Sequence, residues 1–121
     1  MADQDLDLSL LNEIADGSDE FIVDSIDMFL QQVPEILEAI AAGLTADDLT
    51  AAGGAAHKLK PTLGFFGMLN TQAIIQQIET ACKTNSESVA EIDAKLDQAK
   101  AIINANLPQL EQIRADAQSR L

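Results

Sequence analysis

The chain lacks, or has few of, several residue types that mark particular classes of protein. It has no tryptophan, no tyrosine and one cysteine among its 121 residues. A single cysteine, Cys82, cannot form an internal disulfide, which predicts a reducing, cytoplasmic compartment. Its apolar helical neighbours predict a buried, unreactive thiol. No apolar run approaches ~20 residues and the acidic N-terminus has no basic or apolar leader, so neither a membrane span nor a signal peptide is expected.

Basic residues are also scarce. Seven Lys and Arg stand against 20 Asp and Glu, and the formal net charge is −13. Such a surface repels phosphate backbones and anionic lipids, so nucleic acid and membranes are not expected as partners.

The residues that are abundant favour helices. Hydrophobic residues make up 47% of the chain and are largely Ala, Leu and Ile, which predicts an all-α protein. The length indicates one domain, residues 1–121, and a monomer is the default expectation. Apolar spacing of three and four residues predicts five helices: Asp5–Ala15, Ser18–Gly43 with a kink at Pro34, Asp47–Gly64 capped by Thr45 or Asp47, Asn70–Thr84, and Ser86–Leu121 with an interruption at Pro108 and a frayed end. Long helices with short connections predict an antiparallel four-helix bundle with a short additional N-terminal helix.

The only histidine, His57, lies in the longest stretch without an acid. No Asp or Glu occurs between Leu49 and Ile78, and this window contains Lys58 and Lys60. A lone imidazole beside lysines, in an otherwise acidic protein, suits chemistry on a phosphoryl group.

A helical wheel separates His57 from the core side of its helix. The expected core residues are Leu49, Ala52, Ala56, Leu59 and Leu63. The residues near His57 on the wheel are Thr50, Gly53, Gly54, Lys60, Pro61 and Gly64. Interior Gly costs a helix about 1 kcal/mol relative to Ala, and interior Pro about 3. Close packing of a neighbouring helix is one explanation for the glycines; a smooth face on which another protein docks is the favoured one.

Other chemistries lack their motifs. One His and one Cys on different helices do not have the ligand spacing of a metal site. No nucleophile triad and no Gly-rich phosphate loop is present, so no cofactor of its own is expected.

The segment Ala56–Met68 (AHKLKPTLGFFGM) resembles the signature of histidine-containing phosphotransfer (HPt) domains. In that pattern a Lys follows the His by three residues, and a Gly, here Gly67, follows it by ten. Phe29, Leu30 and Pro34 resemble the family's upstream helix, and the resemblance runs from about Leu8 to Lys83. The chain departs from the pattern at Pro61, where Gly is common although some members carry Pro, and at Thr71, where Leu is usual.

The resemblance implies a phosphorelay intermediate without catalytic turnover of its own. His57 would accept a phosphoryl group from a receiver aspartyl phosphate or a sensor or hybrid histidine kinase, and pass it to a response-regulator aspartate. Mg²⁺ would come from the receiver partner. Lys60, one turn from His57, can reach the phosphoryl oxygens, and the resemblance gives Gln76 and Glu79 contacts with the imidazole or the phosphoryl group. Gly53, Gly54, Lys58, Pro61 and Gly64 would form the docking face.

Two other classes remain open. The same helical bundle can act as a non-phosphorylated interaction module that docks a receiver or kinase. An acyl-carrier-like protein is small, acidic and helical too, but it needs Asp-Ser-Leu at a helix start, and the chain has Asp7-Leu8-Ser9-Leu10 instead.

Overall fold

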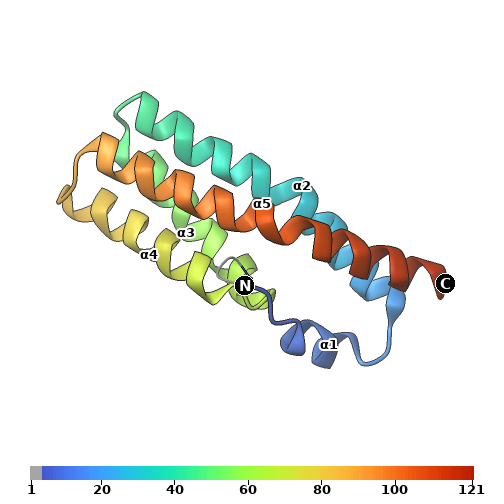
Figure 1. Ribbon diagram of the computed structural model, residues 1–121. Helices are drawn as coiled ribbons and strands as arrows, with labels where there is room; N and C mark the ends of the chain where they lie inside the picture. Colours follow the sequence, from blue (N-terminus) through green and yellow to red (C-terminus); the bar gives the residue numbers. More distant parts are fainter. Residues whose placement is uncertain (1–3) are drawn as a thin grey trace.

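The computed structural model describes residues 4–121 and contains five helices in that range. They are α1 (Ser9–Ala15), α2 (Asp19–Thr45), α3 (Leu49–Phe65), α4 (Leu69–Thr84) and α5 (Val89–Ser119). The four long helices lie side by side, and α1 lies at the end of the bundle where α2 begins (Figure 1). The predicted all-α class, with a bundle and a short N-terminal helix, is confirmed. The predicted domain of residues 1–121 includes three residues that lie outside the described range.

Each long helix packs on two neighbours, in the cyclic order α2, α3, α4, α5. In this order the groove between α3 and α4 lies opposite the groove between α2 and α5. The buried apolar side chains of all four helices form one core, in which the Phe29 and Phe66 rings meet edge to face with centroids 4.8 Å apart.

The predicted start of the first helix at Asp5 is wrong, because α1 begins at Ser9 and Asp5 bonds instead to the start of α4. The Asp5 carboxylate is buried and accepts hydrogen bonds from the backbone N–H groups of Asn70 (3.1 Å) and Thr71 (2.7 Å). It also accepts from the Thr71 hydroxyl at 2.7 Å. Asp7 accepts from the backbone N–H of Ser9 at 3.0 Å, just ahead of α1.

Other helix ends differ from the predicted ones by a few residues. α2 continues to Thr45 rather than ending at Gly43. The N-cap of α3 is Asp48, not Thr45 or Asp47, and its side chain accepts from the backbone N–H of Ala51 at 3.1 Å. α4 begins one residue early, at Leu69.

The last helix begins later than predicted and does not fray early. Ser88 and Glu91 form a capping box, in which each side chain accepts from the other residue's backbone N–H, so α5 begins at Val89 rather than Ser86. The helix ends at Ser119. Pro34, Pro61 and Pro108 all lie inside helices that continue past them.

The turn between α3 and α4 depends on Gly67. Its φ is +66°, and a Cβ there would lie 2.2 Å from the carbonyl oxygen of Asp7. The backbone N–H of Asp7 donates to the carbonyl of Phe66 at 3.2 Å, so the N-terminal segment crosses directly over this turn.

We expect Gly67→Ala to lower the free energy of unfolding by about 2–3 kcal/mol, because it adds steric overlap to left-handed backbone strain. Gly17→Ala is the matched control, since Gly17 has φ +86° but a Cβ there would meet nothing within 4 Å. It should cost only about 1 kcal/mol. Denaturant unfolding of both variants measures the difference, and equal losses would contradict the close approach of Asp7.

Candidate functional site

His57 lies on the side of α3 that faces away from the core. Its side chain is 69% exposed. Ala52, Ala56, Leu59 and Leu63, on the opposite side of the helix, are fully buried. The imidazole is therefore accessible to a docking protein. The residue that hydrogen-bonds to its ring lies on α4 and not on its own helix.

Glu79 on α4 holds one ring nitrogen. The carboxylate is buried, and Oε2 lies 2.8 Å from His57 Nδ1. A carboxylate can only accept a hydrogen bond, so Nδ1 carries a proton, and in the neutral imidazole Nε2 then keeps a free lone pair. The arrangement leaves the nucleophilic nitrogen available on an exposed side chain.

Lys60 completes the group from the next turn of α3. Its Nζ lies 2.5 Å from Glu79 Oε1, and its side chain is only 21% exposed. Each carboxylate oxygen of Glu79 therefore faces a different cationic or N–H group. Because Lys60 and His57 are three residues apart, both side chains reach the same acid on the neighbouring helix.

The pKa of the Glu79 carboxyl is lowered, chiefly by the hydrogen bond from Lys60 and also by the hydrogen bond from His57, against the opposing effect of burial. Glu79 is therefore ionised at neutral pH. A depressed folded-state pKa stabilises the fold above the ordinary pKa of a glutamate, and this contribution is lost as the pH falls through the lowered pKa.

Gln76 joins the site through the lysine rather than through the imidazole. Its Oε1 accepts from Lys60 Nζ at 2.6 Å, and its Nε2 donates to Thr80 Oγ1 at 3.1 Å. The ammonium of Lys60 is thus placed between Glu79 and Gln76.

The structure adds two residues that the sequence analysis missed. Gln72, one turn before Gln76, donates from Nε2 to the backbone carbonyl of Lys60 at 2.9 Å. Lys83, one turn after Glu79, has its Nζ 3.9 Å from Glu79 Oε2. Their four-residue spacing from Gln76 and Glu79 was the available signal, since it places all four on one face of α4.

Two of the predicted docking glycines have an intramolecular explanation. Gly53 is buried, and a Cβ there would lie 3.1 Å from the Cβ of Cys82, so it allows close packing of α3 on α4. A Cβ on Gly64 would lie 2.8 Å from Gln72 Nε2, so this glycine makes room for the bond to Lys60. Both glycines therefore have a role in packing within the bundle, and their predicted part in docking stays a prediction.

The other predicted docking residues are accessible. A Cβ on Gly54 would meet nothing within 4 Å, and Lys58 and Pro61 are exposed. A hollow between α3 and α4 is bordered by His57, Pro61 and Leu69, and the Leu69 residue is 61% exposed. The imidazole thus lies beside the exposed apolar side chains of Pro61 and Leu69 rather than in an enclosed cavity.

The remaining groups give no sign of a different chemistry. Cys82 is buried, and burial raises the pKa of its thiol, which keeps the thiol unreactive. Within residues 4–121, no three His, Cys, Asp or Glu side chains gather where they would hold a metal ion. No helix in that range has the length and apolar character needed to cross a bilayer.

The site is thus an exposed imidazole held by a buried acid on the face of a four-helix bundle. The model of the Hpt domain family matches residues 24–116, which is most of the chain. The chain therefore belongs to the Hpt domain family, whose members transfer phosphoryl groups in two-component signalling and interact with receiver domains and kinases. Searches among curated proteins and among solved structures found no significant match.

Proposed function

We propose that His57 is the phosphoryl-accepting residue of a phosphorelay intermediate. The observation that carries the proposal is the hydrogen bond between Glu79 and Nδ1, because in the neutral imidazole it leaves Nε2 as the unprotonated nitrogen of an exposed ring. The phosphoryl donor is a receiver aspartyl phosphate or a sensor or hybrid histidine kinase, and the acceptor is a response-regulator aspartate. The chain acts as a carrier and not as an enzyme with its own turnover.

The transfer step follows from the geometry. The Nε2 lone pair attacks phosphorus, the N–P bond forms as the P–O bond to the donor aspartyl group breaks, and the aspartate carboxylate leaves. The ring keeps its proton on Nδ1, and Glu79 balances the positive charge that the ring acquires. Phosphoryl transfer depends mainly on positioning and charge stabilisation, which Lys60 supplies from the same helix face.

The partner must supply the metal ion for the transfer. We infer that Mg²⁺ is bound by the receiver domain, whose acidic site faces the lysines around His57. Lys58 and Lys83 are exposed on either side of the imidazole and would attract that acidic site, although the protein as a whole is strongly acidic.

The direct test is incubation with receiver domains phosphorylated at their aspartate, followed by mass-spectrometric mapping. An acid-labile phosphoryl group on His57 is the expected product. Receiver binding without any transfer would instead favour the alternative of a non-phosphorylated interaction module.

Lys60→Ala should slow transfer by about ten- to one-hundredfold and shorten the lifetime of the phosphohistidine, because one charge-assisted contact is lost. Stopped-flow or quench-flow transfer and dephosphorylation time courses measure both effects. Lys58→Ala is the matched control: it removes an exposed lysine two residues away and should change the rate by no more than a few-fold. Unchanged kinetics and lifetime in Lys60→Ala would remove the role assigned to this lysine.

A further inference from the structure

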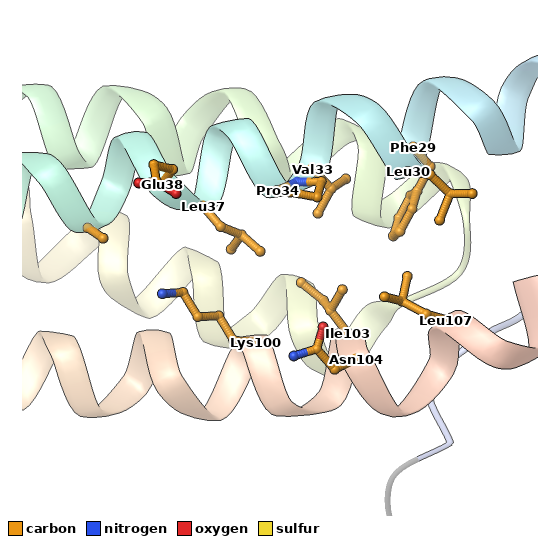
Figure 2. Close-up of a pocket in the computed structure, with 11 residues that line it drawn as sticks. Phe29, Leu30, Val33, Pro34, Leu37, Glu38, Lys100, Ile103, Asn104 and Leu107 are labelled. Carbon is orange, nitrogen blue, oxygen red and sulfur yellow. The ribbon is translucent and has the colours of Figure 1, made fainter.

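A second feature of the bundle lies in the groove opposite the histidine. A cavity of about 300 Å³ opens between α2 and α5. Most of its wall is apolar and comes from both helices, as Figure 2 shows for Phe29, Leu37 and Leu107. His57 and its partners lie on α3 and α4, so the cavity plays no part in the site described above.

Two helix-interior prolines lie near the cavity. Pro34 on α2 borders it, and Pro108 on α5 directly follows Leu107, which also borders it. The ion pairs Asp27–Arg114 and Asp19–Arg120 set the antiparallel register of α2 and α5, which brings Pro108 to about the level of Pro34. Neither proline can donate a backbone hydrogen bond to the carbonyl four residues before it.

The residues that lose a hydrogen-bond donor also border the cavity. They are Leu30, four residues before Pro34, and Asn104, four residues before Pro108. The wall thus combines apolar side chains with the side-chain amide of Asn104.

One end of the cavity carries a lysine that no acid neutralises. Lys100 is half-buried, and within the described residues it forms no ion pair, unlike five of the seven basic side chains. Glu38, on the opposite rim, is exposed and not bonded to it (Figure 2). In a chain with a net charge of −13, an unpaired ammonium beside an apolar wall marks a place where an anion would be stabilised.

We propose that this cavity binds a small amphiphilic carboxylate. The apolar chain lies along Phe29, Leu37 and Leu107, and the carboxylate lies between the Lys100 ammonium and the Asn104 amide, on the side away from Glu38. At about 30 Å³ per water-sized volume, the cavity holds roughly ten non-hydrogen atoms. The proposal does not depend on phosphotransfer, because it concerns the opposite groove.

Titration of the ¹⁵N-labelled protein with octanoate, which has this size, tests the proposal. We expect saturable shifts of backbone amides confined to residues 29–41 and 100–107, with a dissociation constant on the order of 0.1–1 mM. Octylammonium should bind at least tenfold more weakly, and neutral 1-octanol should fall between the two.

Three variants test the contact with the ligand's carboxylate separately from the contacts of its apolar chain with the cavity. Lys100→Gln should weaken octanoate about five- to tenfold and leave 1-octanol unchanged. Glu38→Gln should strengthen octanoate two- to threefold by removing a like charge. Ala41→Phe, which fills part of the cavity from a half-buried position, should weaken both ligands at least tenfold, with far-UV circular dichroism confirming the fold.

The contrary results are equally specific. The proposal is overturned by a lack of saturable shifts below about 10 mM, by shifts centred on α3 and α4, or by octylammonium binding as tightly as octanoate. It is overturned as well if Lys100→Gln leaves octanoate affinity unchanged. Phosphotransfer through His57 can fail or succeed independently of each of these outcomes.

Discussion

His57→Gln should abolish phosphoryl acceptance completely, because the glutamine amide nitrogen has no lone pair available to attack phosphorus. A donor that labels the wild-type chain should leave this variant unlabelled at every time point. The substitution is well suited to the site, since the side chain is exposed and an amide N–H can replace Nδ1–H as the donor to Glu79.

Two controls make this result interpretable. The free energy of unfolding of His57→Gln should stay within about 0.5 kcal/mol of the wild type, as expected for an exposed position. Binding of a receiver domain, measured by calorimetry, should also persist. Labelling of the variant by the same donor would show that another residue accepts the phosphoryl group.

Glu79→Gln should slow transfer by at least tenfold, because a neutral amide cannot replace both functions of the carboxylate. Glu79 accepts from His57 at one oxygen and faces the ammonium of Lys60 with the other. Glutamine has one acceptor oxygen, so its N–H₂ group must face either the ring N–H or the ammonium. The loss of one charge-assisted contact, about 1.5–3 kcal/mol, corresponds to roughly ten- to one-hundredfold.

Glu87→Gln is the matched control for this variant. Glu87 also pairs with a lysine, since its Oε2 lies 2.7 Å from Lys95 Nζ, but this pair lies at the start of α5. The control should leave transfer unchanged. If Glu87→Gln slowed transfer as much as Glu79→Gln, the effect would belong to net charge and not to the contacts with His57 and Lys60.

The difference in stability between the wild type and Glu79→Gln is also predicted to depend on pH. Because the pKa of Glu79 is lowered in the folded state, its carboxylate stabilises the wild type fully above the ordinary glutamate pKa. That advantage should be present at about pH 7 and shrink by about pH 3, as the pH falls through the lowered pKa. Denaturant unfolding at the two pH values measures it, and a constant difference would mean that Glu79 does not titrate with folding.

The helices and the exposed position of His57 followed from periodicity, because apolar spacing within one helix reports which side faces the core. The long helices were therefore predicted to within a few residues of their ends, and Leu59 and Leu63 were correctly assigned to the core side. Periodicity does not report which neighbour lies across from a given residue. That limit explains why Gly53 was attributed to docking although it faces Cys82.

The contacts that escaped prediction join residues far apart in the chain. Gln72 bonds a backbone carbonyl of α3, and Asp5 caps a helix that begins 64 residues later. The cavity between α2 and α5 likewise depends on the register of two helices, since its lining residues come from segments about 60 residues apart in the chain. No short stretch of sequence predicts these contacts, because the partners come together only when the helices have packed into the bundle.

The hydrogen bonds of Asp5 link the bundle to a segment that lies outside the region matched by the family model. The match to the Hpt family begins at residue 24, whereas the first backbone N–H groups of α4 and the buried Thr71 hydroxyl are satisfied by residue 5. The backbone N–H of Asp5 in turn donates to Asn106 on α5 at 3.1 Å, so this short segment ties two helices of the bundle together. A protein trimmed to the recognised boundary would keep its histidine but lose the caps on the helix that orients it.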